Sequence, residues 1–154
     1  VRFLDDVKDS LIDGKSVIMN FSGNIPWYND MTEFLEQKLS FMTDTRSVIY
    51  DDVTSITAEP GKYLFTKYFS ESERRKYWTD KSYEQFMAEN NNTILNHRIL
   101  CITGINSGNA VSWLKTVSEY LEHRNSEERC IFILFVQNAN TNGSKLISNF
   151  QYAD

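Results

Sequence analysis

The sequence predicts an α/β fold, a three-layer sandwich in which helices cover a mostly parallel sheet of four or five strands. Short apolar runs led by β-branched residues alternate along the chain with segments whose apolar residues recur at helical spacing. The apolar runs are nearly continuous, which is typical of strands buried on both faces of a parallel sheet. With 154 residues, 41% of them hydrophobic and 24% charged, we expect one domain over 1–154, on its own or as a piece of a longer protein.

The first third of the chain predicts two helices and two strands in alternation. An amphipathic N-terminal segment that stops at Gly14 predicts a helix. The run SVIMNF predicts a buried strand at 16–21. An apolar stripe predicts a helix over 27–40, and the run SVIYD predicts a second strand at 47–51.

The middle of the chain, 59–96, predicts a helical insert between the second and third strands. It opens with a turn signal, Glu-Pro-Gly, at 59–61. Aromatic residues at 63–69 indicate one short helix, and a capping-box match at 70–73 indicates another. A third helix is expected near 81–95.

The last third predicts a strand at 98–105, a helix at 107–124, a strand at 130–136 and a weaker fifth strand at 145–152. Strands joined by right-handed crossovers place all their carboxyl ends at one edge, where such folds bind ligands. The element string leaves the strand order open, and a flavodoxin-like winding fits it as well as other orders do.

The loop after the first strand occupies the position of a phosphate-binding loop but lacks its chemistry. A phosphate-binding loop needs several glycines, a Lys and a Ser or Thr. Here SGNIPWYND has one glycine, and no Lys lies between Lys15 and Lys38. The third strand ends without a carboxylate, and the fourth ends in Gln137 and Asn138, where a polar sensor residue would fit.

By element order over most of the chain, the layout resembles the core of the P-loop NTPases, especially the AAA+ and related group. The diagnostic motifs of that family are missing from this sequence. The resemblance therefore implies a degenerate, NTPase-like domain that does not hydrolyse ATP by the usual machinery, and we expect no catalytic residue set, no cofactor and no metal.

Five residues at the predicted carboxyl edge are candidates for ligand binding: Ser22, Gly23, Asn24, Asp51 and Asp52. The first three lead into a predicted helix, whose N-terminus attracts anions. The two carboxylates suit Mg²⁺, although a solvated turn explains them equally simply. A nucleotide- or phosphate-binding protein with a non-standard site is therefore the first alternative function, with weak or absent nucleotide binding as the expectation.

A basic and aromatic cluster in the insert is the candidate partner-binding site: Arg74, Arg75, Lys76, Tyr77 and Trp78. Residue types of this kind form hot spots in protein interfaces, and they also suit nucleic acid. A solvated helix face with its aromatic residues in the core is the structural explanation. Because the net charge is −5, nucleic acid is the less favoured partner and the second alternative.

The leading functional interpretation is a non-catalytic interaction or scaffolding domain that binds protein partners. Cys101 and Cys130 each lie inside an apolar run, which favours buried free thiols and a cytoplasmic location. No run approaches the length of a membrane span, so we expect no membrane association.

Overall fold

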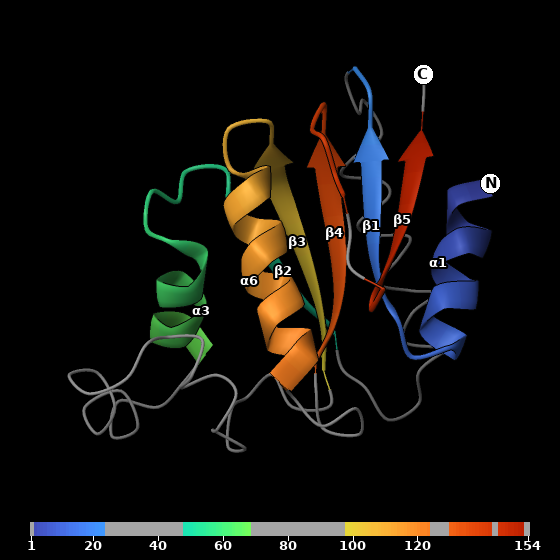
Figure 1. The fold of residues 1–154 in the computed structure, drawn as a ribbon, viewed down its shortest axis with the longest axis horizontal. Helices are drawn as coiled ribbons and strands as arrows, with labels where there is room; N and C mark the ends of the chain where they lie inside the picture. Colours follow the sequence, from blue (N-terminus) through green and yellow to red (C-terminus); the bar gives the residue numbers. More distant parts are fainter. Residues whose placement is uncertain (1, 24–47, 69–97, 124–129, 143–144, 153–154) are drawn as a thin grey trace.

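The computed structural model describes residues 2–23, 48–68, 98–123, 130–142 and 145–152. Within these ranges the chain forms one five-stranded sheet in which every neighbouring pair is parallel, in the order β2-β3-β4-β1-β5 (Figure 1). The strands are β1 (Ser16–Phe21), β2 (Val48–Asp52), β3 (Ile99–Asn106), β4 (Ile131–Gln137) and β5 (Ile147–Tyr152). The α/β class and the parallel sheet predicted from the sequence are confirmed.

Three helices lie in the described ranges: α1 (Arg2–Ile12), α3 (Pro60–Tyr68) and α6 (Ala110–His123). Helix α3 begins at Pro60, so the turn predicted at 59–61 is wrong, and these residues instead open a helix. Proline is well tolerated in a first helical turn, where its missing N–H has no helical partner in any case. None of the three helices is long and apolar enough to cross a membrane.

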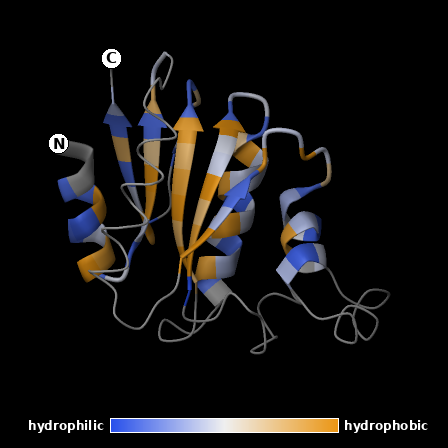
Figure 2. Cartoon of the chain, turned by 180° about the vertical axis from the view of Figure 1, so that it is seen from behind, coloured by the Kyte–Doolittle hydropathy of each residue, from blue (hydrophilic) through white to orange (hydrophobic). Residues whose placement is uncertain are grey.

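Each face of the sheet has its own apolar core, because side chains alternate between the faces along a strand. On one face, Ile18 and Phe132 pack with Trp113 of α6 and Leu64 of α3. On the other face, Met19 and Ile133 pack in a cluster with residues of α1. Figure 1 shows α6 crossing the sheet, and Figure 2 shows hydrophobic residues concentrated along its central strands.

Several predicted elements fall outside the described residues. These are the helix predicted over 27–40, the capping box at 70–73 and the helix near 81–95. The three-layer arrangement of the whole chain, including its helical insert, therefore stays a prediction.

The strand order places a topological switch point at the carboxyl ends of β1 and β4. The chain leaves β4 for β5 at one end of the sheet, whereas it leaves β1 for β2 at the opposite end. Connections that diverge in this way open a crevice, the usual ligand position in open α/β sheets. The observed order also differs from the flavodoxin-like 2-1-3-4-5 winding that the sequence left open.

Gly104, near the end of β3, allows a close approach of the turn that follows β2. Its φ is +87°, and a Cβ built there would lie 2.3 Å from Thr54 Oγ1 and 2.6 Å from Asp52 Oδ1. Gly14 also has a positive φ, +70°, but a Cβ there would meet nothing within 4 Å.

We therefore predict that Gly104→Ala costs about 3 kcal/mol of unfolding free energy, from backbone strain and steric overlap together. Gly14→Ala is the matched control, because it adds only the strain, about 1 kcal/mol. Urea denaturation of the two variants measures the difference, and equal losses would show that the contact with the turn after β2 is not tight.

Candidate functional site

The loop after β1 is tied to both neighbouring strands. Ser22 is held by β5, because its backbone N–H donates to the Tyr152 carbonyl at 2.9 Å and its hydroxyl donates to the same oxygen at 3.3 Å. Ser22 is exposed, while the preceding Phe21 is buried and stacks on the Tyr152 ring with centroids 5.1 Å apart. The end of β1 is thus fixed against β5 by backbone and ring contacts.

Gly23 is held from the other side by the end of β4. Its backbone N–H donates to Asn138 Oδ1 at 2.9 Å, and its carbonyl accepts from Gln137 Nε2 at 2.5 Å. The Asn138 N–H in turn donates to the Phe21 carbonyl at 2.9 Å. We call these three hydrogen bonds the β1–β4 clasp. Both polar backbone groups of Gly23 are therefore satisfied by neutral side chains.

The clasp depends on two residues with left-handed backbone conformations. Gly23 has a φ of 78° and Asn138 a φ of 51°. Glycine adopts this region without strain, and asparagine does so more readily than other residues with a Cβ. The third residue predicted for this loop, Asn24, lies outside the described residues.

A carboxamide network lies beside the clasp on the α6 face of the sheet. Asn20 of β1 is 6% exposed, and its Nδ2 donates to the Ala139 carbonyl at 2.6 Å and to Gln151 Oε1 at 2.8 Å. Gln151 Nε2 continues the network to Thr141 Oγ1 at 2.9 Å and to Asn149 Oδ1 at 3.0 Å. Asn149 Nδ2 donates back to the Thr141 carbonyl. The network fastens the segment after β4 to β1 and β5.

One acceptor of this network has no partner. Asn20 Oδ1 is buried and makes no hydrogen bond. The amide orientation is set by its neighbours, because the atom 2.6 Å from the Ala139 carbonyl must be the donor. A buried, unpaired carbonyl oxygen is uncommon and costs free energy.

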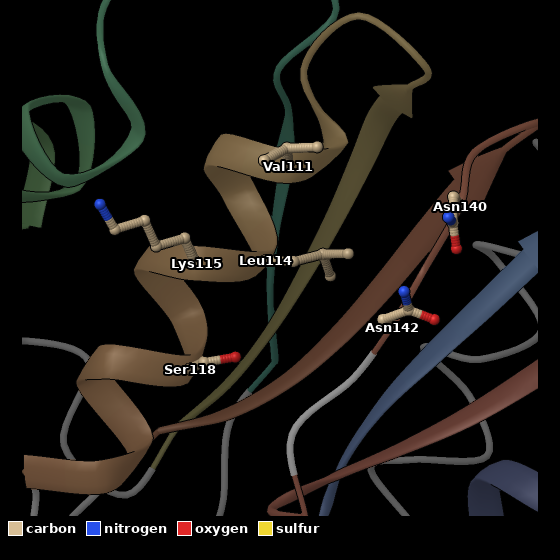
Figure 3. A pocket seen from close by; sticks show the side chains of 6 residues that line it. All are labelled: Val111, Leu114, Lys115, Ser118, Asn140 and Asn142. Carbon is tan, nitrogen blue, oxygen red and sulfur yellow. The ribbon is translucent and has the colours of Figure 1, made fainter.

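A cavity of about 510 Å³ opens next to this oxygen. Its lining includes Asn20, Ser22, Asn138, Asn140 and Gln151, from the ends of β1, β4 and β5. A second hollow, of about 360 Å³, lies between α6 and the segment after β4 (Figure 3). Figure 3 shows Leu114 pointing from α6 towards Asn140 and Asn142, while Lys115 points to the opposite side.

The predicted acidic pair at the end of β2 is divided between two roles. Asp51 is 5% exposed and accepts hydrogen bonds from Tyr63 at 2.7 Å and Tyr68 at 2.6 Å. Lys67 Nζ lies 3.1 Å from its Oδ2. All three partners belong to α3, so Asp51 anchors that helix to the edge of the sheet.

The titration of the α3 residues reflects this anchor. Burial raises the pKa of Tyr68, and the hydrogen bond to Asp51 raises it further. Burial also raises the pKa of Tyr63, with Lys67 opposing and Asp51 adding to the shift. For Lys67, burial lowers the pKa, but hydrogen bonds to Tyr63 and Asp51 outweigh it and leave the pKa raised. Both tyrosines are therefore held neutral and Lys67 charged.

Asp52 serves the turn after β2. Its Oδ1 accepts from the Thr54 hydroxyl at 2.6 Å and from the Thr54 N–H at 3.1 Å. The Thr54 hydroxyl bond lowers the pKa of Asp52 against the opposing effect of burial. The residue is exposed, and the two carboxylates lie at successive strand positions, so they point to opposite faces. No group of three metal-ligating side chains gathers anywhere in the described ranges.

The sequence-predicted site residues are thus only partly brought together. Ser22 and Gly23 lie at the switch point, while Asp51 and Asp52 lie at the edge strand β2, two strands away from β1. Arg74, Arg75, Lys76, Tyr77 and Trp78 lie outside the described residues. The residue that sequence reasoning missed is Asn20, whose signal was an amide inside the otherwise apolar run VIMNF.

Comparison with known proteins assigns no family. No model of a known protein family matches the chain, and a search of curated proteins finds no significant match.

We predict that Asp51→Asn destabilises the protein by about 2 kcal/mol, because hydrogen bonds to a charged acceptor are lost within a buried site. Asp52→Asn is the matched control at the neighbouring position, and its exposed turn limits the cost to under about 1 kcal/mol. Urea unfolding at neutral pH measures both values. A larger loss for Asp52→Asn would contradict the assignment of Asp51 as the anchor of α3.

Proposed function

We propose that this chain is a non-catalytic interaction domain on a degenerate, NTPase-like α/β fold. The β1–β4 clasp is the observation that supports this proposal most strongly. Gly23 occupies the point where a phosphate-binding loop would present a backbone N–H to its ligand. Here that N–H donates to Asn138 Oδ1, and the Gly23 carbonyl accepts from Gln137 Nε2.

The position of the clasp adds to the argument. It lies at the topological switch point, where a nucleotide would bind in a functional relative of such a fold. A phosphate that approached Gly23 would have to displace a side-chain amide already hydrogen-bonded there. The sequence offers no Lys between Lys15 and Lys38 to compensate for that loss. An all-parallel sheet with β1 at its interior is compatible with the resemblance to the AAA+ and related group, which remains part of the proposal.

The partners we propose are proteins. The basic and aromatic cluster 74–78 has the composition of interface hot spots, in which Trp, Tyr and Arg dominate the binding energy. A cytoplasmic location belongs to the same proposal, and two observations support it. Cys101 and Cys130 are free thiols, and both are buried. Burial raises the pKa of Cys101, which keeps this thiol protonated and unreactive.

We predict that ATP, ADP and GTP leave the melting temperature unchanged, with or without Mg²⁺. A ligand at a hundred times its dissociation constant would add about 2.7 kcal/mol, which raises the melting temperature by several degrees. Thermal-shift titration measures the effect. A clear rise with ATP that Ser22→Ala reduces would favour the alternative, a nucleotide-binding protein with a non-standard site.

We also predict that the combined variant Arg74→Ala, Arg75→Ala, Tyr77→Ala and Trp78→Ala loses protein partners that the unaltered chain retains. Lys8→Ala with Lys15→Ala is the control, because both lysines are exposed and distant in sequence from the cluster. Affinity purification with quantitative mass spectrometry compares the three chains. If all three retain the same proteins, the cluster is not the partner site, and if partner loss is accompanied by salt-sensitive nucleic-acid release, nucleic acid is the partner.

A further inference from the structure

The cavity at the switch point has a polar chemistry that the clasp does not use. Its lining combines Asn20, Ser22, Asn138, Asn140 and Gln151, and among the described residues around it none is charged. A volume of about 510 Å³ is within the range of small-molecule sites. An uncharged lining of this kind favours a neutral ligand over a phosphate.

The network next to the cavity leaves one specific requirement unmet. Both hydrogens of Asn20 Nδ2 are used, one by the Ala139 carbonyl and one by Gln151 Oε1. The oxygen of the same amide, Oδ1, is buried and has no partner. Because it can only accept, a ligand that satisfies it must bring an N–H or O–H donor.

The residues at the mouth of the cavity offer complementary groups. Asn138 accepts from Gly23 through its Oδ1, which leaves its Nδ2 as a donor at the cavity. Asn140 is exposed and lines the same cavity, with both a donor and an acceptor on its side chain. A buried acceptor together with donors at the mouth matches a ligand group that contains an N–H and a C=O side by side.

We propose that this cavity is a binding site for a small, uncharged ligand that carries a carboxamide group. The ligand N–H donates to Asn20 Oδ1, and its carbonyl oxygen accepts from the carboxamides of Asn138 and Asn140. The site is independent of the proposed interaction function, because it does not involve the cluster 74–78 or a protein partner.

Benzamide is the probe, titrated into the full chain and followed by NMR signals of the backbone and side-chain amides. N,N-dimethylbenzamide keeps the ring and the carbonyl but has no N–H, and benzoate replaces the amide by a charge. We expect benzamide to shift the signals of Asn20 and Gln151 with a dissociation constant on the order of 1 mM, as for a fragment of its size. The dimethyl compound and benzoate should bind at least about tenfold more weakly, because each lacks the donor for the buried oxygen.

Two asparagine variants locate the site. Asn140→Ala should weaken benzamide binding about three- to tenfold, since it removes one hydrogen bond at the cavity. Asn142→Ala is the matched control, because Asn142 lines the neighbouring hollow beside α6 and not this cavity. Asn20→Leu should abolish binding, and the Asn140 and Asn142 pair keeps the test decisive if that variant fails to fold.

Three results would overturn the assignment. Benzamide that shifts no signal of β1 or β5 shows that the cavity takes no carboxamide. Equal binding of benzamide and its dimethyl analogue shows that the Asn20 oxygen is not used. Equal effects of Asn140→Ala and Asn142→Ala place the probe elsewhere. Binding of ATP through its phosphates would be a failure of the proposed function and would leave the benzamide result unaffected.

Discussion

The carboxyl end of β1 is fixed by hydrogen bonds from the strands on both sides, and the functional account depends on this constraint. Ser22 is bound to the backbone of β5, and Gly23 is bound by the side chains of Gln137 and Asn138 at the end of β4. These bonds form only because β1 lies between β4 and β5 in the sheet. The strand order thus determines which groups meet at the switch point, and the groups that meet there are neutral amides.

The sheet places its charged and its neutral polar groups in separate regions. At the edge strand β2, Asp51 is buried against Lys67 and two tyrosines of α3, and the pair of charges anchors a helix. Near β1 and β5 the buried polar residues are Asn20 and Thr141, which carry no charge. Burial of an unpaired charge would cost far more than burial of an amide. The neutral network can therefore tolerate one unpaired oxygen beside a cavity, as the charged site at β2 could not.

Most strands could be predicted from the sequence, because continuous apolar runs are a strong local signal. β1 at Ser16–Phe21 has the predicted bounds, and β2 is shifted by one residue. Helix α6 begins at Ala110, later than predicted, because Asn109 accepts a hydrogen bond from the Asn106 N–H in the turn before it. Such side-chain bonds to nearby backbone delay a helix start, and apolar spacing does not reveal them.

The candidate site was less accessible to sequence reasoning, for two physical reasons. The β1–β4 clasp joins residues more than a hundred positions apart, and pairing at that range follows from strand order, which the element string left open. Asp51 was placed with Asp52 at the carboxyl edge, but its side chain faces α3, because alternate residues of a strand point to opposite faces. Asn20 was visible as an amide in an apolar run, but its unpaired oxygen depends on the positions of Ala139 and Gln151.

Hydrogen exchange of the Gly23 backbone amide, measured by NMR with and without inorganic phosphate, tests the clasp most directly. The account predicts an amide protected by its bond to Asn138 Oδ1, whose signal and exchange rate do not change with phosphate. Asn138→Ala should abolish that protection. A Gly23 amide that exchanges as freely as an unfolded chain, or whose signal moves with added phosphate, would contradict the clasp and restore a phosphate-binding loop to this position.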